Sequence, residues 1–213
     1  MSVTFIILSA GKLRIKGESR PAPMISYQEG TVIDRQISAI LEAYKKPDIV
    51  VGIGYQAQAV TDYISQKYPA VRIVENKNYK STSSIETLRL SINATIESNL
   101  FVIHGDRIFS KESIVTSKKS YLSYIESCKS NPSIGITHQG SELLNMSYGL
   151  NEPWSEILFV SRKDYRKFKH GLNHLTYKQY SIPEYINLGN VKFEAIKAEG
   201  IVGLKNENIV LCR

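Results

Sequence analysis

The first half of the chain alternates short apolar runs with segments in which apolar residues recur every three or four positions. The runs have the length and β-branched character of buried strands, at residues 3–9, 48–53, 71–75 and 100–104. The segments between them have helical spacing, over residues 31–44, 57–68 and 84–96. This alternation predicts an α/β fold in which helices cover both faces of a parallel sheet.

The second half of the chain has a less regular pattern. It predicts helices at residues 112–127, 163–170 and 183–188, and strands at residues 133–137, 156–161 and 191–197. Glycine and proline residues between positions 10 and 25 predict a loop after the first strand. Because no repeat, low-complexity tract or linker interrupts the pattern, we expect a single domain over residues 1–213.

The composition is that of a globular protein, since 42% of the 213 residues are hydrophobic and 22% are charged. The apolar runs are far shorter than the roughly 20 residues of a membrane helix. The N-terminus also lacks the charged segment of a signal peptide, so we expect no membrane partner. Two cysteines, Cys128 and Cys212, are too few for a disulfide framework or a cysteine-rich zinc site. They favour a reducing, cytoplasmic location.

Positive charge gathers in two places along a chain whose net charge is +7. The loop after the first strand sets four basic residues against Glu18, a local charge of +3, with Lys12, Arg14, Lys16 and Arg20. Residues 162–178 set six basic residues against Asp164, a local charge of +5. Such clusters indicate anionic ligands, although the second is equally typical of a solvated basic face.

Two loops are expected to meet at one edge of the sheet. In open parallel sheets, ligands bind beyond the carboxyl ends of the strands, where the strand order reverses. That point would bring residues 10–14 beside His104, Gly105 and Asp106. The first loop offers backbone N–H groups and cations for phosphates, and Asp106 offers a carboxylate for a divalent metal. The pair predicts a metal–nucleotide site, although an aspartate at a strand end is also a common turn cap.

An ordered set of short motifs resembles the nucleotidyltransferase family, which includes sugar-phosphate nucleotidylyltransferases and phosphocholine cytidylyltransferases. The apolar strand that ends in Ala10-Gly11 resembles the opening strand and glycine loop of that family. Gly105-Asp106 resembles its metal-binding turn. Further motifs occur in the family's order between these two, at residues 30–36, 50–55, 75–79 and 83–88.

The resemblance implies a single Rossmann-like, three-layer domain with a mostly parallel central sheet. Residues 1–110 would form its nucleotide-binding half and residues 111–213 its acceptor-binding half. The implied reaction joins an NTP, with CTP as one candidate, to a phosphorylated sugar or alcohol and releases pyrophosphate. In that reaction Asp106 would bind Mg²⁺. Nucleotide contacts would come from Ala10, Gly11, Ser83 and Ser84, and the catalytic cations would be Lys12, Arg14, Lys16 and Arg20.

The chain departs from the family pattern at three places. Leu13 occupies the position of the second glycine in the glycine loop. Ala22-Pro23 occupies the position of a phosphate-binding lysine, which Lys16 or Arg20 would have to replace. Gly203 aligns with a second metal-binding carboxylate, for which Glu199 and Glu207 are nearby candidates. We therefore expect weak or narrowly specific transfer, with a catalytically impaired nucleotide- or sugar-binding homologue as the alternative.

Two other functions fit parts of the sequence. Gly52, Gly54 and Ala57 have the spacing of an NAD-type dinucleotide fingerprint, and Glu75 follows near the expected distance. Aromatic residues such as Tyr165 and Phe168 interleave with the second basic cluster, as in a nucleic-acid surface. Aromatic residues at this spacing are more often core residues, so the sequence argues against nucleic acid as a partner.

Overall fold

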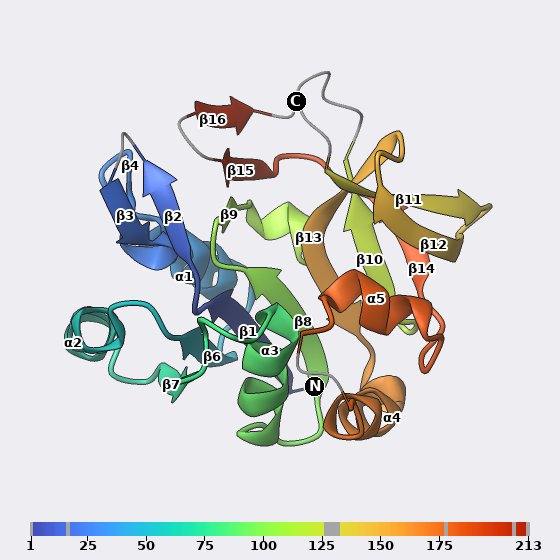
Figure 1. Cartoon of the computed structure of the whole chain (residues 1–213), viewed down its shortest axis with the longest axis horizontal. Coiled ribbons are helices and arrows are strands. Elements are labelled where there is room, and N and C mark those ends of the chain that lie inside the picture. The colour runs from blue at the N-terminus through green and yellow to red at the C-terminus, as the bar shows by residue number, and fades with distance from the viewer. Residues whose placement is uncertain (1, 16–17, 126–132, 177–178, 206–207, 212–213) are drawn as a thin grey trace.

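The computed structural model describes residues 2–15, 18–125, 133–176, 179–205 and 208–211. Its centre is a nine-stranded sheet with the order β10-β14-β12-β11-β13-β8-β1-β6-β7 (Figure 1). The bounds of these strands, in chain order, are β1 (Val3–Ser9), β6 (Asp48–Ile53), β7 (Arg72–Glu75), β8 (Asn99–His104), β10 (Tyr121–Tyr124), β11 (Ile134–Gln139), β12 (Glu142–Tyr148), β13 (Glu152–Val160) and β14 (Glu194–Lys197).

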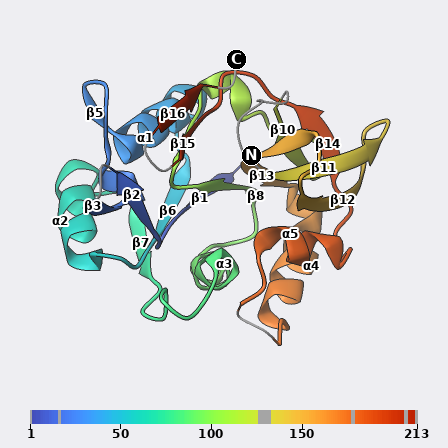
Figure 2. The same cartoon turned by 45° about the horizontal axis from the view of Figure 1, so that its top comes forward.

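The predicted parallel region is present as β7-β6-β1-β8. All seven residues of β1 are buried, because helices cover this strand on both faces. One face packs against α1 (Val32–Ala43) and α2 (Ala57–Lys67), and the other packs against α3 (Ser84–Asn93), α4 (Arg162–Asn173) and α5 (Ile182–Asn187). Figure 2 shows α1 on one side of the sheet and α3 and α4 on the other. The structure therefore confirms the predicted α/β class and its two helical layers.

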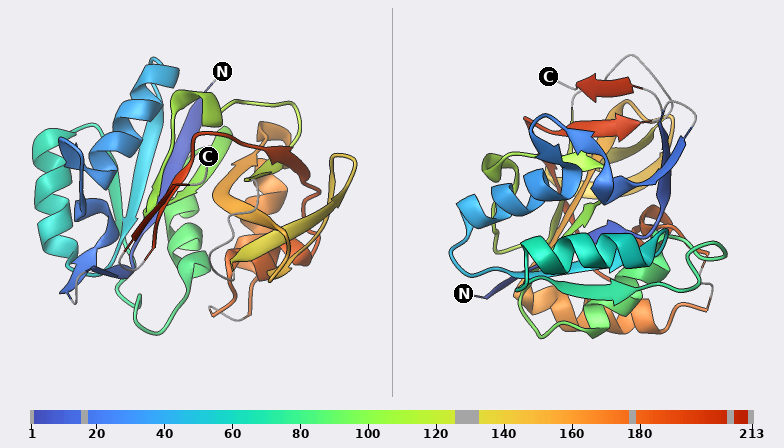
Figure 3. Two further views of the ribbon diagram at one scale, coloured as in Figure 1. Left: turned by 90° about the horizontal axis from the view of Figure 1, so that it is seen from above. Right: turned by 90° about the vertical axis from the view of Figure 1, so that its left-hand side faces the viewer.

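The prediction of a mostly parallel sheet is wrong for the second half of the chain. β13 runs antiparallel to β8, and of the nine strand pairings described within this sheet five are antiparallel. β10 also pairs with β13, so that β10, β14, β12, β11 and β13 close on one another as a small barrel. For β11 and β12 the short connection explains the antiparallel pairing, because strands joined without a crossover pair as a hairpin. Figure 3 shows this barrel beside the parallel region.

Two local predictions also fail. The helix expected at residues 112–127 is a 3-10 turn at Lys111–Ser113 followed by β10, and its last two residues lie outside the described chain. Tertiary pairing decides this segment, because β10 lies hydrogen-bonded between β13 and β14. The loop expected at residues 10–25 contains a hairpin of β2 (Lys12–Ile15) and β3 (Glu18–Pro21).

Other short elements surround the open edge of the parallel strands. A 3-10 turn at Ala22–Met24 and the strand pair β4 (Ser26–Tyr27) and β5 (Gly30–Thr31) lead into α1. A separate sheet of order β16-β15-β9 contains β9 (Arg107–Ile108), β15 (Val202–Lys205) and β16 (Asn208–Leu211). This small sheet brings the C-terminal segment to the turn that carries Asp106, as the upper part of Figure 1 shows.

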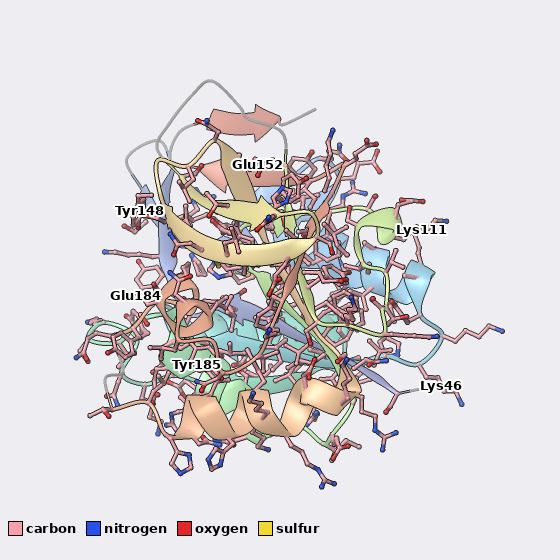
Figure 4. The ribbon with its side chains drawn as sticks, turned by 90° about the vertical axis from the view of Figure 1, so that its right-hand side faces the viewer. Lys46, Lys111, Tyr148, Glu152, Glu184 and Tyr185 are labelled. Atoms are coloured by element: carbon pink, nitrogen blue, oxygen red, sulfur yellow. The ribbon has the colours of Figure 1, made fainter. Side chains whose placement is uncertain are left out.

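Helix starts follow their predicted signals with small shifts. Thr31 caps α1 in a reciprocal capping box with Asp34. The cap of α3 is Ser83, one residue before the predicted Ser84. On the barrel side, Tyr185 of α5 packs over α4, where its hydroxyl donates to the carbonyl of Phe168 at 2.7 Å (Figure 4). These contacts fix the scaffold on which the loops at the carboxyl ends of β1 and β8 are displayed.

Candidate functional site

A cavity of about 220 Å³ lies at the carboxyl ends of β1 and β8. The loop after β1, the turn after β8 and the start of α3 all contribute to its wall. Six of the residues predicted as site residues line it together: Ala10, Gly11, Lys12, Ser83, Ser84 and Asp106. The structure thus brings together the two loops that the strand order predicts as neighbours, since β1 lies between β6 and β8.

The other predicted cations are placed differently. Arg20 lies on β3 and lines a separate, open hollow with Tyr55 and Gln56. Arg14 lies on β2, whose hairpin partner is β3, and Lys16 lies outside the described residues. Of the predicted cations whose side chains the structure describes, Lys12 lines the cavity and Arg20 does not. Its ammonium group is 5.9 Å from the ring centroid of Tyr55.

A glycine is required where β8 ends against β1. The N–H of Gly105 donates to the carbonyl of Leu8 at 2.9 Å. A Cβ on Gly105 would lie 2.0 Å from Oγ of Ser9 and 2.9 Å from the Leu8 carbonyl oxygen. This close approach places Asp106 directly over the end of β1, at the opening of the cavity.

The glycines of the dinucleotide-like motif have packing roles. Gly52 lies inside β6 and pairs with neighbours on both sides, so it is not part of a phosphate-binding loop. A Cβ on Gly52 would lie 2.5 Å from a methyl group of Thr87 in α3. A Cβ on Gly54 would lie 2.8 Å from the carbonyl oxygen of Ala10. Close packing of strand, helix and loop accounts for this motif, and the cavity lies over β1 instead.

Asp106 belongs to a compact group of charged side chains. Ligand atoms of His104, Asp106 and Glu156 all lie within 4.8 Å of one another. Nδ1 of His104 is 3.2 Å from the Glu156 carboxylate. Nε of Arg107 donates to the same carboxylate at 2.9 Å, and a second guanidinium nitrogen pairs with its other oxygen. Nε of Arg107 also lies 3.8 Å from the carboxylate of Asp106.

The electrostatics of this group distinguish its two carboxylates. Burial raises the pKa of Asp106, and the charge of Glu156 raises it further against the opposing effect of Arg107. Burial would also raise the pKa of Glu156, but His104 and Arg107 outweigh it and hold that pKa well below its usual range. Glu156 is thus an ionised carboxylate whose charge is balanced by His104 and Arg107. The ionised form of Asp106 is the one that a cation in the cavity would stabilise.

Sequence reasoning missed Glu156 as a member of the site. It lies on β13, fifty residues after Asp106, and reaches the turn only because β13 pairs with β8. Its backbone has a φ of +66°, a left-handed conformation that is uncommon outside glycine and costs energy. A lone glutamate in an otherwise apolar strand pattern was the only signal that could have singled it out.

The position expected for a second carboxylate lies beside this turn but carries no acid. Gly203 of β15 pairs with Arg107 of β9, next to Asp106. Glu199 has an exposed side chain, and Glu207 lies outside the described residues. Ala22, at the position expected for a lysine, lines the cavity with a methyl group.

In the described part of the second basic cluster, two aromatic residues are unavailable for stacking on bases. Tyr165 and Phe168 are buried in the core between α3 and α4. Two of the basic residues, Arg162 and Arg166, pair with Glu97, and Lys178 lies outside the described residues.

Among the helices that the structure describes, none has the length and apolar character of a membrane span.

Comparisons with known proteins find a likeness in sequence over part of the chain and a wider likeness in fold. No model of a known protein family matches the chain. Over 122 residues, 56% of this chain, it is 27% identical to the 2-aminoethylphosphonate cytidylyltransferase of Lancefieldella rimae. The match spans 49% of that protein, so the chain covers about half the length of this curated relative.

Solved structures of similar fold include two cytidylyltransferases. The CTP:phosphocholine cytidylyltransferase of Streptococcus pneumoniae superposes with a TM-score of 0.77 at 20% identity, over 96% of this chain and 94% of that one. The inositol-1-phosphate CTP transferase of T. maritima superposes with a TM-score of 0.72 at 12% identity, over 92% and 85% of the two chains. At these identities the likeness is one of fold.

Proposed function

We propose that this chain, a member of the nucleotidyltransferase family by fold and by sequence resemblance, transfers a nucleotidyl group from an NTP to a phosphorylated sugar or alcohol. The observation that carries the proposal is the cavity in which the glycine loop, the start of α3 and Asp106 meet. CTP is the proposed nucleotide, because the sequence relative and two structural relatives are named as users of cytidine nucleotides. The same three names support a phosphorylated or phosphonylated acceptor.

The chemistry requires positioning more than covalent catalysis. An oxygen of the acceptor phosphate forms a bond to the α-phosphorus in line, while the bond from that phosphorus to the bridging oxygen breaks and pyrophosphate leaves. Backbone N–H groups of Gly11 and Lys12 and the Lys12 ammonium group would bind the departing phosphates, a role that the position of both residues in the cavity wall supports. The N-terminus of the ten-residue α3, at Ser83 and Ser84, adds positive helix-dipole potential to the same wall.

A divalent metal, Mg²⁺ in the first instance, fits the residues around Asp106. Burial raises the pKa of Asp106, so the ionised carboxylate is disfavoured unless a cation binds beside it. Ser9 is 1% exposed and lines the same cavity, and its Oγ has no hydrogen-bond partner among the residues that the structure describes. When bound, the metal would neutralise charge on the phosphates. Asp106 would hold it, and Gly105 keeps Asp106 close to the end of β1.

The position of the cavity supports separate roles for the two halves of the chain. Its wall is built from residues 8–106, which supports residues 1–110 as the nucleotide-binding half. The barrel strands of residues 111–213 adjoin it through the pairing of β13 with β8, which supports this half as the site of the acceptor.

A second function, binding without turnover, is favoured by two positions. Ala22 supplies no charge to the cavity, and Gly203 supplies no second carboxylate beside Asp106. Each lost preorganised contact costs roughly a hundredfold in the rate of such reactions. Pyrophosphate release, measured with each NTP against a panel of phosphorylated sugars, alcohols and phosphonates, separates the two functions. Release that needs both substrates establishes transfer, and none with any pair, alongside tight NTP binding, establishes the binding function.

A further inference from the structure

The turn after β8 carries a ring nitrogen whose surroundings are unusual. His104 and Asp106 flank Gly105, and both line the cavity. Nδ1 of His104 is directed at the Glu156 carboxylate, 3.2 Å away. Its other ring nitrogen, Nε2, is buried and has no hydrogen-bond partner among the described residues. A buried polar atom without a partner is costly, and a bound water, ligand or ion is one way in which such an atom is satisfied.

Glu156 is held in place by other charges, so it serves as an orienting group. Both of its carboxylate oxygens pair with the Arg107 guanidinium, and one of them also faces His104. The ring of Trp154 lies across the imidazole at 78°, with 5.5 Å between the ring centroids, and limits its rotation. The imidazole is thus fixed from two sides by residues of β13.

This arrangement is the one that prepares a histidine to bind a metal. When one ring nitrogen of a neutral imidazole donates its hydrogen to a carboxylate, the other carries the lone pair that a cation can accept in place of a proton. Metal-binding histidines nearly always make such a bond through their second nitrogen, which fixes the tautomer and strengthens the ligand. Asp106 supplies a carboxylate in the same group, in which one ring nitrogen of His104 and one oxygen each of Asp106 and Glu156 lie within 4.8 Å of one another. Oγ of Ser9, a second buried atom without a partner, lines the same cavity.

We propose that Nε2 of His104 is a direct ligand, together with Asp106, of the divalent cation in this cavity, and that Glu156 is the residue that positions the imidazole. The inference deepens the proposed function, because it concerns the cation that the transfer reaction would use. It also predicts which cation the site prefers. An imidazole ligand raises the affinity of a site for first-row divalent transition metals, least for Mn²⁺ and more for Co²⁺ and Zn²⁺, whereas Mg²⁺ prefers oxygen ligands alone. The chain should therefore bind Mn²⁺ or Co²⁺ more tightly than Mg²⁺.

The decisive readout is spectroscopic and needs no turnover. The full chain is loaded with Mn²⁺ alone, and pulsed electron paramagnetic resonance detects whether a ¹⁴N nucleus is bonded to the metal. We expect a directly bonded nitrogen in the native protein and its loss in His104→Gln. Glu156→Gln should weaken Mn²⁺ binding about 10- to 100-fold, because the orienting carboxylate is lost. His138→Gln is the matched control, since His138 also faces a carboxylate, that of Glu152, but lies on the barrel away from the cavity.

Each other outcome overturns the inference. Mn²⁺ bound without a directly bonded nitrogen would mean an all-oxygen site, and a nitrogen signal that persists in His104→Gln would assign it elsewhere. No Mn²⁺ binding at all would also contradict it. The native spectrum answers the question even if a variant fails to fold. Pyrophosphate release without the nitrogen signal would overturn this inference alone, and the signal without release from any NTP would overturn the proposed function alone.

Discussion

Replacing Gly105 by alanine tests the close approach of β8 to β1 on which the site is built. The new Cβ would lie 2.0 Å from Oγ of Ser9, which is 1.4 Å inside the 3.4 Å limit of ordinary contact. Rotation of the serine would remove that overlap, but contacts of 2.9 Å to the Leu8 carbonyl and 3.0 Å to the Ser9 Cβ would remain. The strands are locked in register by the pairing of Leu8 with His104, so they have little room to separate.

Overpacking of this kind costs about 1–3 kcal/mol. For a chain of this size, a loss of about 2 kcal/mol lowers the melting temperature by roughly 4–8 °C. Thermal unfolding followed by circular dichroism measures the shift, and titration with CTP in the presence of a divalent metal should show weaker binding. The turn that holds Asp106 is displaced in the variant, so both effects should appear together.

Gly11→Ala is the matched control, because a Cβ at Gly11 would have no neighbour within 4 Å. We expect its melting temperature to stay within about 1 °C of that of the native chain. The double variant Ser9→Ala/Gly105→Ala should recover part of the lost stability, because the shortest overlap is with Oγ of Ser9. If Gly105→Ala melts no lower than Gly11→Ala, the steric account of this turn is wrong.

Two further predictions concern charge. Hydroxyl groups of Tyr63 and Tyr68 donate to Asp34 at 2.7 and 2.8 Å and, with other donors, outweigh its burial, so its pKa lies well below its ordinary value. A carboxylate whose pKa is lowered by folding stabilises the folded state fully above about pH 4, and this stabilisation is lost as the pH falls. Asp34→Asn should therefore lower the free energy of unfolding by about 2 kcal/mol at pH 7 and by progressively less below pH 4, as measured by urea unfolding. Lys12→Ala should weaken CTP binding about tenfold by calorimetry, while Lys167→Ala on α4 should leave it unchanged; equal effects would place the phosphates elsewhere.

The parallel half of the fold could be predicted because its signals are local. Strands such as β1 and β6 are buried on both faces and are therefore apolar almost throughout, and the helix between them begins at a capping threonine. The resemblance to the nucleotidyltransferase family, carried by motifs in this half, is confirmed by the comparisons. The end of a helix was predicted less well, since α3 ends at Asn93 and not at residue 96, where Ile96 is exposed.

The barrel half could not be predicted in the same way, because its strands depend on distant partners. β10 pairs with β13 and β14, which lie some 30 and 70 residues further along the chain. β12 was missed altogether, since Leu144 and Tyr148 interrupt its polar face with exposed apolar side chains. Figure 4 shows Tyr148 at the rim of the barrel. Pairing in such sheets is decided by neighbours that a local pattern does not contain.

The candidate site also contains residues that local patterns predict and a residue that depends on distant strand pairing. Lys12 and Asp106 follow strands whose order could be anticipated, and the structure places both at one cavity. Glu156 could not be anticipated, because only the antiparallel pairing of β13 with β8 carries it to Asp106. The roles of these residues, the metal and a cytoplasmic location remain predictions.

The central claim is that Asp106 holds the metal of a nucleotidyl transfer reaction. The most direct test measures pyrophosphate release from CTP and the best phosphorylated acceptor by the native chain, by Asp106→Asn and by Asp62→Asn. Asp62 lies on the exposed side of α2 and contacts Gln58, so it serves as the matched control. We predict a loss of at least a hundredfold for Asp106→Asn at an unchanged melting temperature, and native release for Asp62→Asn. Native release by a folded Asp106→Asn variant would contradict the account.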